Sequence, residues 1–311
     1  MESKQSFSSN KGLVLVLSTA FISGFSIFVN SFGVKEFNPY IFTFLKNLLV
    51  SFLLIGLILG LKEFKNLVRL GGRDWLILSI IGLVGGSIPF LLFYKGLPQT
   101  SAANGAFIHK TMFLYVAFLA FVFLKERISP KILFGALLLL LGNAIFLKIL
   151  PYGSRSGDLL ILGATLFWAI ENVISKNALK TLSPRIVAFG RMGIGSVFIL
   201  LFLIVSGNIQ TVSRLTPLHF QWILISSVIL FGYVTTWYTG LKYISVSVAT
   251  SILLLGSPIT SLLAFFFAGG KITPNQIWGT ALILIGIVAV IGVQKVASVL
   301  KPVFKLFYVR S

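Results

Sequence analysis

Cysteine is absent from this 311-residue sequence, and acidic residues and histidine are scarce, with 7 Asp and Glu and 2 His in all. Without cysteine the chain can form no disulfide, no thiolate metal site and no thiol nucleophile. The sequence also contains no HExxH, GxSxG or P-loop motif and no pair of carboxylates within one apolar run. These absences argue against an enzyme, and we expect no catalytic residue, no metal site and no cofactor.

Charge is also rare, because charged residues make up only 11% of the chain, whereas a soluble domain carries about a quarter. Hydrophobic residues make up 57%, and the mean hydropathy is +0.99. Helical apolar runs of about 20 residues match a hydrocarbon core of about 30 Å. The sequence therefore predicts an all-α membrane protein with ten transmembrane helices and no soluble domain. We expect these helices at 12–32, 38–61, 74–94, 100–124, 131–148, 157–180, 184–206, 218–240, 245–268 and 274–294.

The formal net charge is +19, with 26 Lys and Arg residues, a surplus that in a soluble domain would suggest nucleic acid. Here the basic residues are scattered through short loops and helix ends, so we expect no nucleic-acid partner. With a cytoplasmic N-terminus, 17 of the 26 fall in cytoplasmic segments, 6 in outside segments and 3 inside spans. By the positive-inside rule, this bias predicts a multi-pass protein of the plasma (cytoplasmic) membrane with both termini in the cytoplasm.

The sequence repeats itself. A shift of 144 positions places Gly96 on Gly240 and Pro130 on Pro274, and a shift of 145 in the front part of each copy places Lys46 on Arg191. Each copy contains an apolar helix, a Ser/Thr-Pro break and a second apolar helix. The protein is therefore expected to be one five-helix unit used twice. Further matched pairs are Ser101 and Ser245, Ile108 and Ile252, Ala120 and Ala264, Phe123 and Phe267, Gly135 and Gly279, and Gly142 and Gly286.

Five is an odd number, so the second unit must enter the membrane from the side opposite to the first. Inverted repeats of this kind are typical of secondary transporters, whose substrate site lies near the middle of the membrane between the repeats. The alternative is a duplication that persists in a membrane protein without any transport role.

The region of the Pro130 turn also resembles a known family. The run 123–130, FLKERISP, followed by Gly135 and Gly142, resembles the EamA signature of the drug/metabolite transporter superfamily. The run 271–276, KITPNQ, followed by two glycines at the matching positions, is similar to the same motif. The resemblance implies ten helices in two inverted EamA repeats, and export or uptake of small metabolites.

On this basis we divide the chain into a first EamA repeat at 1–149, a second, inverted repeat at 150–294 and a basic amphipathic cytoplasmic tail at 295–311. The tail is expected to lie on the inner leaflet and to attract anionic lipid; binding of a protein partner is the alternative. The second copy departs from the pattern, because Gly269-Gly270 stands where an acidic residue is expected. If Glu126 caps a helix end in the first copy, the second copy has lost that cap.

Four charged residues fall well inside spans: Lys46, Lys110, Glu171 and Arg191. Each costs roughly 2.5–3.5 kcal/mol at the middle of the membrane, so we expect all four to face a cavity or one another. Three cations against one carboxylate favour a substrate with a carboxylate or another anionic group. For Lys46 the alternative is a side chain that reaches the membrane surface.

Glu171 and Arg191 lie at similar depths on adjacent helices, on either side of the turn 182–184. An interhelical ion pair is one reading, and a pair that also gates or contacts substrate is the other. Glu171 is the one intramembrane carboxylate, which makes it the candidate for proton coupling.

Trp168, Glu171, Asn172 and Ser175 follow one another at i, i+3, i+4 and i+7, as a polar and aromatic stripe on an otherwise apolar helix. We expect the stripe to line the cavity, although Trp168 alone could serve packing. His109 precedes Lys110, and adjacent helical residues point about 100° apart, so the two are not expected to face one ligand squarely. His109 is read as a partner in an interhelical hydrogen bond, with a proton relay as the alternative.

Tyr94 and Tyr238 are repeat-mates, and Trp237 precedes the second. An aromatic belt at the two membrane surfaces explains them, and gating of the cavity is the alternative. We expect Pro89, Pro258 and the glycine pairs at 85–86 and 269–270 to bend or end helices. The spacings Gly56-xxx-Gly60 and Gly82-xxx-Gly86 would permit close helix contact.

Together these features predict a secondary transporter of a small organic metabolite, amino-acid-like or carboxylate-bearing, that works by alternating access. The residues assigned to substrate binding are Lys46, His109, Lys110, Trp168, Glu171, Asn172 and Arg191, and those assigned to gating are Tyr94, Trp237 and Tyr238. An exporter of neutral or cationic drugs or metabolites is one alternative; a non-transporting scaffold or a lipid-modifying enzyme is another. Expected partners are the small-molecule substrate and anionic lipids of the inner leaflet, and a monomer is compatible with the sequence.

Overall fold

The computed structural model describes residues 2–32, 38–127, 129–148, 156–293 and 296. Within these ranges the chain is helical and contains no strand, and ten helical stretches are long and apolar enough to cross a membrane. They run over Ser9–Asn30, Pro39–Gly60, Gly72–Gln99, Ala103–Leu124, Pro130–Leu147, Ser156–Ala178, Pro184–Val205, Pro217–Tyr243, Val246–Phe267 and Pro274–Ile291. The predicted fold class and its ten spans are therefore confirmed, while the tail at 295–311 lies outside the described residues apart from Val296.

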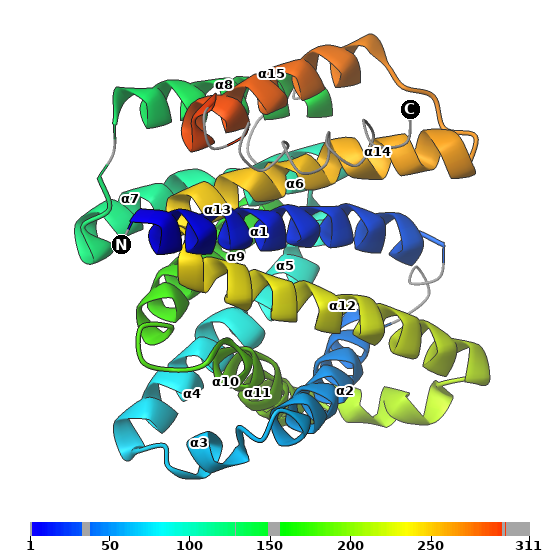
Figure 1. Cartoon of the computed structure of the whole chain (residues 1–311). Coiled ribbons are helices and arrows are strands. Elements are labelled where there is room, and N and C mark those ends of the chain that lie inside the picture. The colour runs from blue at the N-terminus through cyan, green and yellow to red at the C-terminus, as the bar shows by residue number, and fades with distance from the viewer. Residues whose placement is uncertain (1, 33–37, 128, 149–155, 294–295, 297–311) are drawn as a thin grey trace, which may run out of the picture.

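The helices of the two halves are shown in Figure 1. The first half contains α1 (Glu2–Asn30), α2 (Pro39–Gly60), α3 (Phe64–Val68), α4 (Gly72–Gly86), α5 (Ile88–Gly96), α6 (Ala102–Lys110), α7 (Met112–Leu124) and α8 (Pro130–Leu147). The second contains α9 (Ser156–Ala178), α10 (Pro184–Phe189), α11 (Gly195–Val205), α12 (Pro217–Tyr243), α13 (Val246–Ile252), α14 (Gly256–Phe267) and α15 (Pro274–Ile291).

Five of the spans start in the same way, with proline directly after a residue that can cap a helix. The pairs are Asn38-Pro39, Ser129-Pro130, Ser183-Pro184, Thr216-Pro217 and Thr273-Pro274. Proline fits the first helical position because its φ is already helical and its missing N–H would have no partner there. The cap side chain then accepts a hydrogen bond from the first turn, as when Asn38 Oδ1 accepts from the Tyr40 N–H at 3.0 Å.

Several spans are broken inside the membrane. The third changes direction at Ser87, just before Pro89, as expected, and the seventh contains a π-helical turn over Gly190–Ile194. The fourth ends α6 at Lys110 and restarts as α7 at Met112, and the ninth breaks at its repeat-matched place, a 3₁₀ turn over Leu253–Leu255. The fourth span expected at 100–124 is thus present over Ala103–Leu124, with an interruption at Thr111.

The two halves interleave. α1 packs against α12 and α14 of the second half, and its repeat-mate α9 packs against α4, α5 and α7 of the first. The last helices of the two halves, α8 and α15, lie side by side at one edge of the molecule (Figure 1).

The glycines shared by the two copies explain how α8 and α15 come so close. A Cβ on Gly135 would lie 2.8 Å from the Gly286 carbonyl oxygen, and a Cβ on Gly142 would lie 2.9 Å from that of Gly279. Gly135 and Gly279 are repeat-mates, as are Gly142 and Gly286. Each of the two helices therefore contributes two glycines at matching positions of the repeat, and these four glycines allow the close contact between α8 and α15.

The two other glycine spacings behave differently. A Cβ on Gly82 or Gly86 would meet the backbone of the turn 190–195, with the Arg191 carbonyl oxygen only 2.0 Å from that of Gly86. Gly56 and Gly60 have no atom within 4 Å of such a Cβ. The expectation of close helix contact is thus confirmed for Gly82 and Gly86 and wrong for Gly56 and Gly60.

Candidate functional site

A cavity of about 370 Å³ lies among the middle segments of the spans. Eight of the ten residues singled out from the sequence line it: Lys46, Tyr94, His109, Lys110, Trp168, Asn172, Arg191 and Trp237. Glu171 and Tyr238 do not line it. The remaining lining residues are Ser23, Ile27, Phe90, Phe93, Met112, Phe113, Leu230, Tyr233, Thr250, Leu253 and Leu254.

The cavity is built from matching places in the two repeats. Lys46 of α2 and Arg191 of the π-helical turn are repeat-mates, and both line it. The broken fourth and ninth spans also contribute matching residues to the cavity wall. At the end of α6, both His109 and Lys110 border the cavity. Both residues were assigned to substrate binding, and both line the same cavity. Repeat-mates that both line the cavity are Ser23 and Trp168, Ile27 and Asn172, Phe93 and Trp237, His109 and Leu253, and Lys110 and Leu254.

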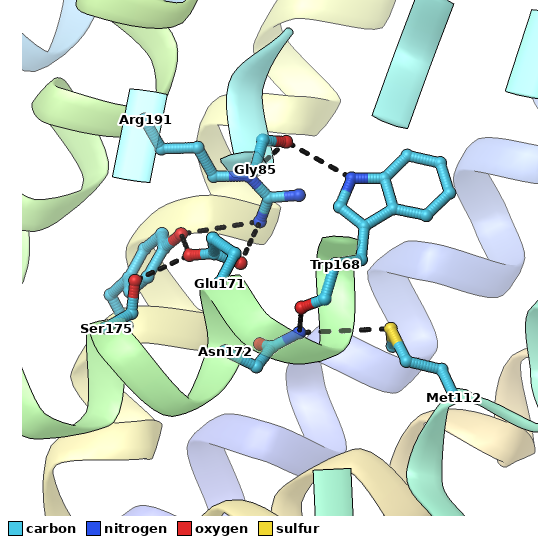
Figure 2. Close-up of polar contacts among 8 residues, drawn as sticks. Gly85, Met112, Trp168, Glu171, Asn172, Ser175 and Arg191 are labelled. Carbon is cyan, nitrogen blue, oxygen red and sulfur yellow. Dashed lines mark hydrogen bonds and ion pairs between the residues drawn. The ribbon is translucent and has the colours of Figure 1, made fainter. Parts of the chain in front are cut away.

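Glu171 is completely buried directly behind the cavity wall, and Figure 2 shows its polar contacts. Its Oε1 accepts hydrogen bonds from Ser175 Oγ at 2.5 Å and from the Tyr238 hydroxyl at 2.7 Å. Its Oε2 lies 3.7 Å from Arg191 Nη1 and has no hydrogen-bond partner among the described residues. The interhelical ion pair is therefore present, but it is long, and only Arg191 reaches the cavity.

Arg191 is positioned by α4, by α12 and, through its ion pair with Glu171, by α9. Its Nε donates to the Gly85 carbonyl oxygen of α4 at 3.4 Å, and its Nη1 donates to the Tyr238 hydroxyl of α12 at 3.4 Å. The guanidinium side chain is 12% exposed. A guanidinium carries five N–H donors, and these two hydrogen bonds use one each from Nε and Nη1, so donors remain for a ligand in the cavity.

Tyr238 lies inside the helix bundle rather than on its outer surface. It is fully buried and donates to Glu171, while Trp237 is 1% exposed and stacks on Tyr233, with ring centroids 6.4 Å apart. Tyr94, the repeat-mate of Tyr238, lines the cavity. The aromatic belt expected for these residues was therefore wrong at Trp237 and Tyr238, because belt residues face the lipid headgroups and these two side chains are buried in the protein.

One wall of the cavity is aromatic. Trp168 donates its indole N–H to the Gly85 carbonyl oxygen at 3.1 Å and forms ring contacts with Phe90, Phe93 and His109. The ring centroids of His109 and Trp168 are 4.9 Å apart. Within the described ranges Nδ1 of His109 is buried without a hydrogen-bond partner, so the interhelical hydrogen bond expected for this residue is not formed by that atom.

Lys46 and Lys110 contrast with Arg191, because neither side-chain ammonium group has a hydrogen bond or ion pair in the part of the chain that the structure describes. Lys46 Nζ lies 5.0 Å from the centroid of the Phe42 ring, and Lys46 borders the cavity. The stripe on α9 is split: Trp168 and Asn172 line the cavity, whereas Glu171 and Ser175 lie behind it.

Sequence reasoning missed eleven lining residues. Five of them could have been found from the repeat, because they are the repeat-mates of Trp168, Asn172, Trp237, His109 and Lys110: Ser23, Ile27, Phe93, Leu253 and Leu254. The others are mostly apolar or aromatic side chains, which are common in every span and carry no signal of depth. No group of three or more His, Asp or Glu that could hold a metal ion is found among the described residues.

Comparison with known proteins agrees with the two-repeat organisation. The family model described as the EamA-like transporter family matches twice, over residues 10–148 and 155–292. A solved crystal structure with 17% sequence identity superposes with a TM-score of 0.70, covering 92% of this chain and 96% of that one. At this identity the likeness concerns the fold alone.

Curated relatives carry the names of transporters. The uncharacterised transporter YyaM of Bacillus subtilis is 27% identical over 76% of this chain and 78% of its own length. An uncharacterised transporter of Archaeoglobus fulgidus is 28% identical over 83% of this chain and 89% of its own. The riboflavin transporter ImpX of Fusobacterium nucleatum is 26% identical over 90% of this chain and 97% of its own.

Proposed function

We propose, from the premise that the chain belongs to the EamA-like transporter family, that this membrane transporter carries a small organic anion, amino-acid-like or otherwise carboxylate-bearing. Its substrate binds in the cavity between the repeats. The residues that bind the substrate are Lys46, His109, Lys110, Trp168, Asn172 and Arg191. Glu171 does not line the cavity and acts through its ion pair with Arg191.

The observation that carries this proposal is the unbalanced charge of the cavity. Lys46, Lys110 and Arg191 line it, whereas the one nearby carboxylate, that of Glu171, is turned away and already accepts hydrogen bonds from Ser175 and Tyr238. Three basic groups around one small volume repel one another unless an anion joins them. A carboxylate suits the free donors of Arg191, and the aromatic wall suits an apolar portion of the substrate.

Transport proceeds by alternating access, with the first repeat (1–149) rocking against the second (150–294) around the cavity. Tyr94, Trp237 and Tyr238 act as gating residues, because they border or support the cavity from the third and eighth spans, which are repeat-mates. The protein resides in the plasma membrane, and both termini face the cytoplasm, as the distribution of Lys and Arg favours.

A second candidate is a neutral, planar aromatic substrate. The observation that favours it is the ring-lined wall of Phe90, Phe93, Trp168, Tyr233 and Trp237, since flat rings stack on aromatic side chains. ImpX, a relative over 90% of this chain, is named a riboflavin transporter. In this case Lys46 and Lys110 would tolerate neutral replacements.

The test is initial-rate uptake into proteoliposomes of labelled amino acids, other carboxylates and riboflavin by the wild type, Lys46→Gln and Lys110→Gln. Lys271→Gln is the matched control, because Lys271 is exposed in the loop before α15. We expect anion uptake to fall roughly tenfold in each cavity variant, since a hydrogen bond to a charged group contributes about 1.5–3 kcal/mol, and to be unchanged in the control.

Equal anion uptake by the wild type and both cavity variants would overturn the anionic substrate, and riboflavin uptake that survives both substitutions would favour the second candidate. For a scaffold or lipid-modifying enzyme, no substrate would be carried. Labelling of the single thiol in Ser23→Cys then distinguishes a transporter from these two alternatives, because the chain has no other cysteine and Ser23 lines the cavity. Protection of this thiol by a carried substrate is expected of a transporter only.

A further inference from the structure

A second hollow, separate from the central cavity, lies on the outer surface of the helix bundle between α4, α7 and α9. We call it the lateral groove. It has a volume of about 610 Å³. Its walls are apolar apart from one residue, Asn177: they are formed by Ile77, Leu119, Phe123, Leu124, Ile170, Val173, Ile174 and Ala178. Phe123 is 68% exposed and Ile170 is 39% exposed, so the groove opens sideways toward lipid.

The polarity of the groove changes along its length. On α9 the apolar residues Ile170, Val173 and Ile174 are followed by the exposed amide of Asn177 and then, just beyond the helix end, by the exposed Lys180. From Ile170 to Ala178 the helix covers about 12 Å at roughly 1.5 Å per residue. Apolar, amide and cationic zones therefore follow one another in a single direction toward the membrane surface.

The other two helices end in the same way. On α7, Leu124 lines the groove and the exposed Lys125 follows it directly. On α4, the exposed Arg73 lies one turn before Ile77 and hence on the same face. Three exposed cations therefore lie within four residues of groove-lining positions at one end of the groove, and none of them has an ion pair to a described residue.

Acidic residues at this end of the bundle are already engaged. The Asp74 carboxylate accepts from the Gly71 N–H at 3.2 Å, and the Glu126 carboxylate accepts from the Val246 N–H at 2.9 Å. Among the described residues, neither carboxylate forms an ion pair with Arg73, Lys125 or Lys180.

We propose that the lateral groove is a binding site for one anionic phospholipid. An acyl chain lies against the apolar walls, the Asn177 amide donates a hydrogen bond at the level of the glycerol esters, and Arg73, Lys125 and Lys180 bind the phosphate-bearing headgroup. Clusters of basic residues between membrane-spanning helices recognise such headgroups, and the order of zones along the groove is that of a phospholipid from tail to head. The site lies among described residues and is distinct from the tail at 295–311.

The experiment is native mass spectrometry of the purified full-length protein with added phosphatidylglycerol or phosphatidylcholine of identical acyl chains. The variant is Arg73→Gln/Lys125→Gln/Lys180→Gln. The control is Lys62→Gln/Lys65→Gln/Arg69→Gln, which removes the same charge from exposed positions around α3. We expect one phosphatidylglycerol bound to the wild type and the control, weaker binding of phosphatidylcholine, and a loss of affinity for phosphatidylglycerol of roughly tenfold or more in the groove variant.

Equal losses in both triple variants would show general attraction to basic residues and would overturn the site, as would equal binding of the two lipids. A native dimer in which Phe123→Cys cross-links to its copy would also overturn it, because a second chain would then cover the groove. Should the triple groove variant fail to fold, Ile170→Trp tests the acyl-chain zone from the exposed lip, and unchanged phosphatidylglycerol binding by that variant would contradict the proposal.

Discussion

The carboxylate of Glu126 caps the N-terminus of α13, with Oε2 accepting from Ser247 Oγ at 2.6 Å and Oε1 accepting from the Val246 N–H at 2.9 Å. Glu126 follows α7 in the first repeat and α13 begins in the second, so this contact joins the repeats. The mirror-related contact is missing because the repeat-mate of Glu126 is Gly270. The backbone turn itself is conserved within the chain: Glu126 N–H donates to the Ala120 carbonyl at 3.1 Å, and Gly270 N–H donates to that of Ala264 at 3.0 Å. Only the side-chain cap differs between the repeats.

Replacing Glu126 by Gln is expected to lower the free energy of unfolding by about 1 kcal/mol, a usual value for the loss of a helix cap. The carboxylate favours the helix N-terminus through its charge as well as its hydrogen bonds. The measurement is thermal unfolding in detergent, combined in a double-mutant cycle with Ser247→Ala. A coupling free energy of zero between the two positions would contradict the cap.

Much of the fold could be predicted from the sequence because it depends on properties that single positions display. Span length, the Ser/Thr-Pro starts and the repeated glycines of α8 and α15 are all visible in the residue order. The breaks inside spans were less accessible. Proline marks the break at Ser87, but no residue type marks the end of α6 at Lys110 or the π-helical turn at Gly190–Ile194, since these arise from packing against other helices.

One glycine from each of the two Gly-xxx-Gly spacings gives a matched pair of substitutions. Gly86→Ala would place a Cβ 2.0 Å from the Arg191 carbonyl oxygen, whereas Gly56→Ala would place one in open space. We expect Gly86→Ala to cost about 2–3 kcal/mol of stability through overpacking. Gly56→Ala should be neutral or stabilising by up to about 1 kcal/mol, because alanine is the better helix former. Thermal unfolding of the two variants checks this, and equal effects would contradict the close contact at Gly86.

The loop between α2 and α3 predicts a pH dependence of stability. Glu63 accepts hydrogen bonds from Arg185 Nε at 2.9 Å and Ser183 Oγ at 3.1 Å, and the hydrogen bond from Arg185 holds the pKa of this carboxyl below its ordinary value. A lowered folded-state pKa adds stability above the unfolded value, about 4.3 for Glu, and that stability is lost as the pH falls through the folded value. Glu63→Gln should therefore unfold at a lower temperature than wild type at pH 7.

The difference between wild type and Glu63→Gln should shrink as the pH falls below about 4. Lys65→Gln, an exposed neighbour on α3, is the control and should differ little from wild type across the same range. A difference for Glu63→Gln that stays constant with pH would show that the carboxylate charge is not responsible.

The site was partly predictable for a different physical reason. Charges inside spans are costly, so Lys46, Lys110 and Arg191 had to face a shared cavity, and they do. Aromatic residues have no such cost, because Tyr and Trp suit a membrane surface and a protein interior equally well. Tyr238 was therefore misplaced at a surface, and Phe90 and Tyr233 were not recognised at all. The hydrogen bond from Tyr238 to Glu171 depends on two helices meeting, which the residue order does not display.

Glu171 and a substrate anion are expected to compete for Arg191, because Glu171 Oε2 lies 3.7 Å from the guanidinium and Arg191 lines the cavity. Glu171→Gln removes the charge but keeps an oxygen that can accept from Ser175 and Tyr238. The guanidinium is then free for the substrate, and the KM for anion uptake should fall roughly three- to tenfold, or about 1 kcal/mol. Ser175→Ala, which leaves the carboxylate in place, should change KM much less. Initial uptake rates over a range of substrate concentrations in proteoliposomes measure both, and an unchanged or higher KM for Glu171→Gln would show that Glu171 supports Arg191 rather than competing for it.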